Sequence, residues 1–189
     1  MIYVKIFYKE QMDTGIYGFV AGKCIRKSII TDNSISFDKS INLAEDYDFF
    51  LKIYNKLDSI LFLDYSGYFY LIGTDNSAIG MSDKKIDFIK QIEIQNKTRT
   101  FLENHNSFGE NEKNLYMKRV AGYIYTILIN CNCNSYKSYL SDYKRLKNTI
   151  QRVNPKEVNS ILIKVILCLY NKNKYSLIFI LLKIKKKTG

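Results

Sequence analysis

An acidic pair between a loop and a helix is the feature that most constrains this chain. The loop SFDKSINLA leads into Glu45 and Asp46. Apolar side chains then recur at helical spacing, at Phe49, Phe50, Ile53, Tyr54 and Leu57. The pair is therefore expected in the first turn of a helix, where unpaired N–H groups and the helix dipole favour ionised carboxylates. An ionised carboxylate at the rim of a sheet can act as a general base, although acidic residues at helix starts usually only stabilise the helix.

The segments on either side of the acidic pair predict a small sheet. IYGFVAGKCIRKSIIT predicts a strand at residues 15–21, a glycine turn and a short helix that ends near Asp32. SILFLDYSGYFYLIG predicts two strands within residues 59–72, joined by a turn that Asp64 opens. IYVKIF, at the start of the chain, has the pattern of a further short strand.

In the order of these pieces the chain resembles glycosyltransferase family 2, the nucleotide-sugar-dependent enzymes with a GT-A fold. The matching pieces are GKCIRKSII, ISFDKSINLAEDYDFFLKI and ILFLDYSGYFYLI, which lie within about residues 15 to 80. The resemblance implies that Asp46 is the catalytic base and Glu45 its acidic neighbour. It also implies a nucleotide sugar as donor and a glycan or lipid-linked acceptor.

Five further residues are candidates for substrate binding. Lys23 and Arg26 stand near the start of the short basic helix, where point charges suit a diphosphate, but solvated surface charges would look the same. The resemblance implies that Tyr68, Tyr70 and Asn76 line the acceptor cleft. Alternating aromatic residues in a strand are also common in cores and interfaces, so packing is the alternative for the two tyrosines.

The family's metal site has no counterpart that the sequence reveals. Family members carry a nucleotide-binding half ahead of this stretch, with an Asp-x-Asp motif that holds Mg²⁺ or Mn²⁺, whereas only residues 1–14 precede it here. Asp46-Tyr47-Asp48 has the same spacing, but its flank KSINLAE predicts a loop rather than a buried strand. Asp48 is therefore expected to cap or support the helix. The resemblance implies a truncated enzyme that is inactive by itself and lacks the metal ligands.

Together these patterns predict an α/β protein in two parts. Residues 1–82 are expected to form a partial GT-A-like domain with a short mixed sheet and helices, and residues 83–189 a helical extension with a basic amphipathic tail. Apolar spacing predicts helices over about 86–102, 116–128 and 136–150. Asn154-Pro155-Lys156-Glu157 has the pattern of a helix start and predicts a fourth.

Charge is divided unevenly between these parts. Residues 1–82 hold 8 Lys and Arg against 10 Asp and Glu, and residues 83–189 hold 21 against 8. The last two apolar runs, SILIKVILCLY and YSLIFILLKIKKK, are shorter than the ~20 residues that cross a bilayer. Apolar helix faces that end in lysines suit helices that lie in a lipid interface. Burial of these faces against the preceding helices is the alternative.

Two functions from different classes are compatible with these features. The first is inverting glycosyl transfer in the synthesis of a bacterial-type surface polysaccharide or glycan. The second is a non-catalytic basic helical module in residues 83–189 that binds an anionic membrane surface, with residues 158–189 as the membrane contact, or, as the weaker variant, nucleic acid. Nucleic acid is not expected as a partner, because no reader motif is present. Scattered cysteines and the lack of a signal peptide indicate the cytoplasm, or a peripheral place at the inner face of the cell membrane.

Overall fold

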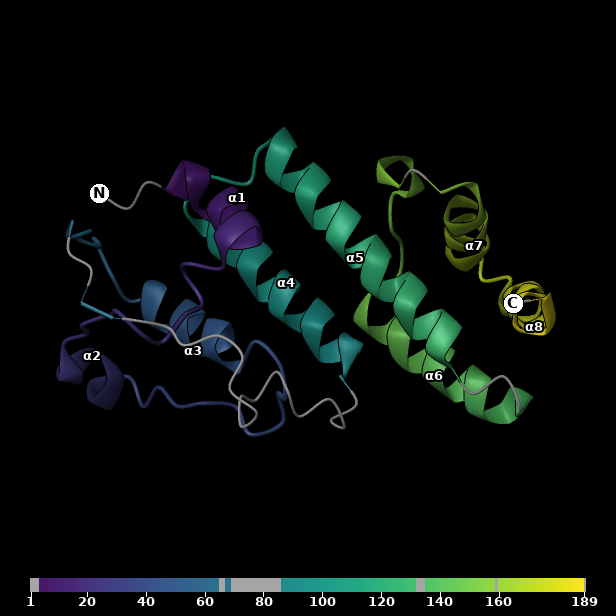
Figure 1. Cartoon of the computed structure of the whole chain (residues 1–189), viewed down its shortest axis with the longest axis horizontal. Helices are drawn as coiled ribbons and strands as arrows, with labels where there is room; N and C mark the ends of the chain where they lie inside the picture. The colour runs from purple at the N-terminus through teal and green to yellow at the C-terminus, as the bar shows by residue number, and fades with distance from the viewer. Residues whose placement is uncertain (1–3, 65–66, 69–85, 132–134, 159, 189) are drawn as a thin grey trace. The chain divides into compact units, whose positions relative to one another are not determined.

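The computed structural model describes residues 4–64, 67–68, 86–131, 135–158 and 160–188 (Figure 1). The chain divides into two compact units. The first comprises Met1–Asp87 and Lys97–Ser107, and the second Phe88–Asn96 and Phe108–Gly189. Helix α4 (Phe88–Asn104) contributes its first half to the second unit and its second half to the first.

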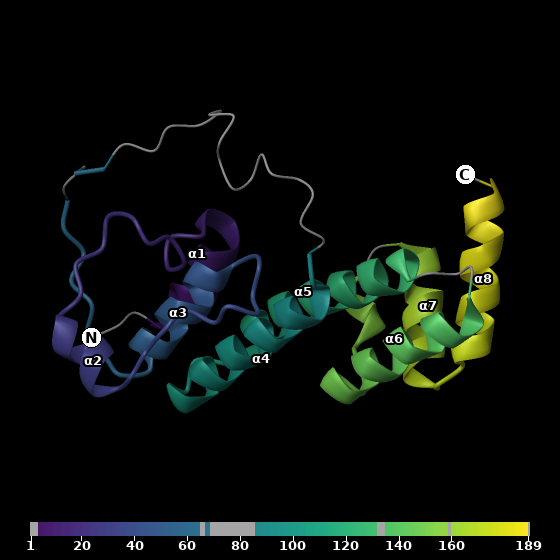
Figure 2. The ribbon, with the colours of Figure 1, turned by 90° about the horizontal axis from the view of Figure 1, so that it is seen from below.

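The first unit is built from α1 (Val4–Thr14), α2 (Lys27–Asp32), α3 (Glu45–Tyr54) and the second half of α4 (Figure 2). Aromatic rings from α1, α3 and α4 and from the turn after α1 form its core. The ring of Phe7 lies 4.2 Å from that of Tyr17 and 5.0 Å from that of Phe101, measured between centroids. The buried hydroxyl of Tyr54 donates a hydrogen bond to the Tyr17 carbonyl at 2.7 Å, which ties the turn to α3.

The second unit contains five further elements and the first half of α4. They are α5 (Glu110–Asn130), α6 (Tyr136–Thr149), the 3₁₀ turn η1 (Pro155–Glu157), α7 (Ile161–Asn171) and α8 (Tyr175–Thr188). Ser135 and Ser160 cap α6 and α7, each by accepting a backbone N–H with its side chain. The buried hydroxyl of Tyr143 donates to the Tyr170 carbonyl at 3.2 Å and so links α6 to α7.

The predicted α/β fold with a GT-A-like mixed sheet is wrong for the part of the chain that the structure describes, which contains helices and no strand. Residues 15–21, predicted as a strand, form turns between Gly15 and Gly22, both at φ 72°. Of that apolar run only Tyr17 is a buried large side chain, while Phe19 and Val20 are exposed. A short apolar run does not by itself distinguish a strand from a turn that buries one ring.

Of the three other predicted strands, two are also wrong. IYVKIF overlaps α1, where the following residues KEQM are good helix formers and Phe7 is buried in the core. Residues 59–64 have no strand structure, and Leu61 and Leu63 are strongly exposed there. Residues 69–72, and the predicted boundary at 82/83, lie outside the described residues.

The helix predictions fared better. The acidic pair occupies the first turn of α3, as expected, and the helices predicted over 86–102, 116–128 and 136–150 are confirmed as α4, α5 and α6. The predicted basic helix is confirmed as α2, but it begins at Lys27, after Lys23 and Arg26. The start signal at Asn154 gives only the 3₁₀ turn: the Asn154 side chain accepts the Lys156 N–H at 3.1 Å, and helix α7 begins later, at Ile161.

Candidate functional site

Lys23 follows the glycine turn and holds it against α3. Its ammonium donates hydrogen bonds to the carbonyls of Ile16, at 2.8 Å, and Phe19. The same ammonium lies 4.6 Å from the centroid of the Phe50 ring, in a cation–π arrangement. Burial lowers the pKa of the Lys23 amine, and the negative charge of Asp46 opposes that shift. Lys23 is therefore a fixed, half-buried cation next to the start of α3.

Asp46 is the carboxylate that this cation influences. Burial raises the pKa of the Asp46 carboxyl, the neighbouring charge of Glu45 raises it further, and the charge of Lys23 lowers it. The sequence led us to expect that the helix start would hold both acids ionised, yet at Asp46 loss of water outweighs the favourable charge. The pKa values of Lys23 and Asp46 are thus shifted in opposite directions, and both shifts favour the neutral form of the group.

The backbone just before the pair is strained. Ala44, the N-cap of α3, has a left-handed conformation with φ 60° and ψ 27°, and it offers no side-chain cap. Its carbonyl still accepts the N–H of Asp48 at 3.1 Å, which begins the helix. A left-handed residue other than glycine costs about 1–2 kcal/mol, and such strain often occurs at functional sites. This strained residue lies immediately before Glu45 and Asp46.

Asp48 has a different environment from that of Asp46. Its side chain is 0% exposed, although it is charged. Lys97 of α4 donates a hydrogen bond to Oδ1, and the Lys52 ammonium lies 2.9 Å from Oδ2 without hydrogen-bond geometry. Asp48, Lys52 and Lys97 thus form a charged triad. Beside it, the hydroxyl of Thr98 donates to that of Tyr47 at 3.1 Å. Asp48 therefore anchors α3 to α4 within the first unit, whereas the capping role expected for it is not seen, since α3 has no side-chain cap.

The structure gives the other predicted site residues that it describes no specific contacts that indicate a role. Glu45 is half-buried beside Asp46. Arg26 is exposed and forms the N-cap of α2 without a side-chain hydrogen bond, and Tyr68 is exposed. Tyr70 and Asn76 lie outside the described residues. Of the predicted set, Lys23 and Glu45 lie near enough to Asp46 for their charges to act on the pKa of its carboxyl.

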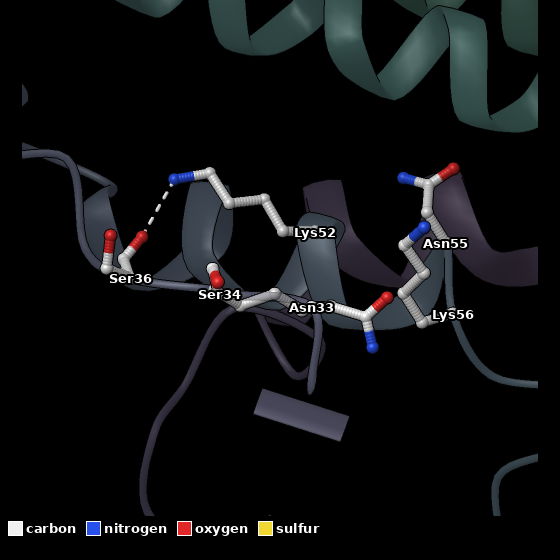
Figure 3. Close-up of a pocket in the computed structure, with 7 residues that line it drawn as sticks. Asn33, Ser34, Ser36, Lys52, Asn55 and Lys56 are labelled. Atoms are coloured by element: carbon white, nitrogen blue, oxygen red, sulfur yellow. Dashed lines mark hydrogen bonds between the residues drawn. The ribbon is translucent and has the colours of Figure 1, made fainter. Parts of the chain in front are cut away.

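A hollow at the C-terminal end of α3, lined mainly by polar residue types, was not predicted. It has a volume of about 370 Å³ and lies between the loop after α2 and the last turns of α3 (Figure 3). Its lining residues are Asn33, Ser34, Ile35, Ser36, Lys52, Asn55 and Lys56. The Lys52 ammonium donates to the Ser36 carbonyl at 2.9 Å along its edge. Lys52 lies in α3, Asn55 is its C-cap and Lys56 follows it; their spacing at i, i+3 and i+4 was the one signal that they share a face.

The chemistry available at the Lys23–Asp46 pair is proton transfer. A partly exposed carboxylate with a raised pKa, next to a fixed cation, can accept a proton from a neutral hydroxyl. In the ranges that the structure describes, no group of three or more His, Cys, Asp or Glu side chains could hold a metal ion. No protein-family model, curated protein or solved structure significantly matches this chain.

Proposed function

We propose that this chain serves in glycosyl transfer from a nucleotide sugar, with Asp46 as the base that activates an acceptor hydroxyl. The observation that carries the proposal is the Lys23–Asp46 pair, in which burial shifts the two pKa values in opposite directions. Perturbed pairs of this kind are more frequent at catalytic sites than elsewhere. The sequence of residues 15–80 around the pair, which resembles glycosyltransferase family 2, supports the same reaction.

The reaction is a single displacement at the anomeric carbon. The acceptor hydroxyl gives its proton to an Asp46 oxygen while its own oxygen bonds to that carbon. The bond from the carbon to the nucleoside diphosphate breaks, and its electron pair leaves with the diphosphate. The configuration at the anomeric carbon is inverted. A raised pKa makes Asp46 a better proton acceptor, while the Lys23 charge limits the rise so that the carboxylate remains available.

The substrates follow from the resemblance. It supports a nucleotide sugar as donor and a glycan or lipid-linked acceptor, in the synthesis of a bacterial-type surface polysaccharide or glycan. Family members use Mg²⁺ or Mn²⁺ to hold the leaving diphosphate. The described residues offer no cluster that fits such an ion, so the steps assigned here are those of Lys23 and Asp46 alone.

Transfer of sugar to glycan acceptors tests the proposal. Because the resemblance implies a donor site ahead of the matching stretch, the assay uses the longest native polypeptide that contains these residues, with a panel of uridine and guanosine diphosphate sugars. Asp46→Asn is expected to cut turnover by ~10²-fold or more, as loss of a general base typically does. Glu45→Gln is expected to cost less.

Asp58→Asn is the matched control, because Asp58 is exposed just beyond the C-terminus of α3. It should leave turnover unchanged. An Asp46→Asn variant that transfers sugar at the wild-type rate would refute the role of Asp46. A wild-type polypeptide that includes a donor site ahead of residue 15, yet releases no nucleoside diphosphate from any donor in the panel, would refute transfer itself.

A further inference from the structure

Helix α8 has two opposite apolar sides, and one of them faces solvent. Ile178 and Leu182 are buried in the second unit. Leu177, Ile180 and Ile184 recur at i, i+3 and i+7, which places them on one side of the helix, and they are 49%, 52% and 56% exposed. Burial against the preceding helices, one of the two alternatives that the sequence left open, therefore holds for one side of α8, while the other side is exposed.

Helix α7 repeats this arrangement. Its buried side carries Ile166, Leu167 and Tyr170. The opposite side exposes Ile161, Val165 and Cys168, at i, i+4 and i+7, with Leu162 beside them. Helices α7 and α8 contact each other. Two neighbouring helices thus present apolar side chains to solvent while both are anchored in the core.

The charged side chains of α7, α8 and the turn between them are all of one sign. Residues 158–189 contain seven lysines and no Asp or Glu. The five whose side chains are described are exposed: Lys164, Lys172, Lys174, Lys183 and Lys185. A second copy of the chain would bring an identical cationic surface against this one, and like charges would repel. The surface that complements apolar side chains ringed by cations is an anionic lipid layer.

The helix lengths indicate binding on a membrane surface rather than across the bilayer. At 11 and 14 residues, α7 and α8 are about 16 and 21 Å long, against a hydrocarbon core of about 30 Å. Among the described residues, no helix is both long enough and apolar enough to span a bilayer.

We propose that the exposed sides of α7 and α8 dock on an anionic lipid surface. Leu177, Ile180 and Ile184, with Ile161 and Val165, enter the boundary between headgroups and acyl chains. The lysines contact the headgroup phosphates. This docking is a property of the second unit, beyond the glycosyl transfer proposed for the first, and it does not depend on that reaction.

Co-sedimentation of the full chain with vesicles tests the docking. The vesicles are phosphatidylcholine alone, or phosphatidylcholine with about 30% phosphatidylglycerol as a source of negative charge. Binding is expected to the anionic vesicles only, and to weaken as salt rises. The double variant Ile180→Asp with Ile184→Asp should lower the partition coefficient by ~10-fold or more, because both side chains would carry charge into the lipid.

The matched control is Leu61→Asp with Leu63→Asp, since both leucines are strongly exposed in the first unit. It should bind anionic vesicles as the wild type does. Circular dichroism and melting curves show whether each variant is folded. A second measurement does not depend on the aspartate variants: the chain has no tryptophan, so Leu177→Trp adds a single fluorophore. Its emission should shift to shorter wavelength on anionic vesicles, and that of Leu61→Trp should not.

Three results would overturn the proposal. The first is failure of the wild type to bind anionic vesicles, and the second is equal binding by a folded Ile180→Asp, Ile184→Asp variant. The third is an unchanged Leu177→Trp emission on anionic vesicles. If light scattering instead shows a dimer that these aspartates dissociate, and vesicles are not bound, a second copy of the chain covers this surface.

Discussion

Replacement of Asp48 by Asn removes the only negative charge of the Asp48–Lys52–Lys97 triad without changing the shape of the side chain. The carboxylate is 0% exposed, while the side chains of Lys52 and Lys97 are 34% and 47% exposed. Loss of one partner from a fully buried ion pair costs about 3–5 kcal/mol. Because water reaches both lysines here, and the amide oxygen can still accept from Lys97, we expect a smaller cost, of about 2 kcal/mol.

Urea unfolding followed by circular dichroism measures this cost, and hydrogen exchange of the α3 amides assigns it to the first unit. A double-mutant cycle with Lys97→Met should give a coupling free energy of about 1 kcal/mol or more. Asp13→Asn is the control, because it breaks the Lys9–Asp13 pair, whose atoms lie 3.0 Å apart but whose side chains are mostly exposed. That change should cost less than about 0.5 kcal/mol. If Asp48→Asn were as mild as Asp13→Asn, the triad would not anchor α3 to α4.

Three further predictions concern the same unit. The raised pKa of Asp46 means that its ionisation disfavours the folded state: its contribution to stability is greatest below the unfolded pKa and is lost as pH rises through the folded pKa. Asp46→Asn should therefore raise the urea midpoint at pH 7 and not at pH 3. An equal change at both pH values would contradict the conclusion that ionisation of Asp46 destabilises the folded state. Ala44→Gly should stabilise the protein by about 0.5–1 kcal/mol in urea, because glycine adopts the left-handed conformation without strain. Tyr54→Phe should cost about 1 kcal/mol by leaving the buried Tyr17 carbonyl unpaired, whereas Tyr68→Phe, at an exposed position, should be neutral in the same assay.

Sequence periodicity predicted the long helices well, because α4, α5 and α6 repeat apolar side chains over several turns. It failed at residues 15–21 and 59–64. Over so few residues an apolar run fits a strand, a turn or an exposed loop equally, and what decides is the packing of a distant ring such as Phe7 on Tyr17. Glycines at 15 and 22 were visible, but their left-handed conformations were not.

The candidate site was predicted only in part. Charge pattern identified Lys23 and Asp46, although not that burial would shift the pKa of each. The partner of Asp48 lies 49 residues along the chain at Lys97, and no local spacing reveals such a pair. The hollow beside Lys52 likewise depends on how the loop after α2 folds back on α3.

Carbon-13 NMR titration of the Asp46 carboxyl, in the wild type and in Lys23→Met, tests the central claim that these two residues form one electrostatic site. The pKa of Asp46 should lie above the ordinary aspartate value in the wild type, because burial dominates, and higher still in Lys23→Met, because the opposing cation is gone. Arg26→Met, which removes an exposed cation near by in sequence, should leave the pKa unchanged. An Asp46 carboxyl that titrates at or below its ordinary value, or that does not respond to the loss of Lys23, would contradict the site.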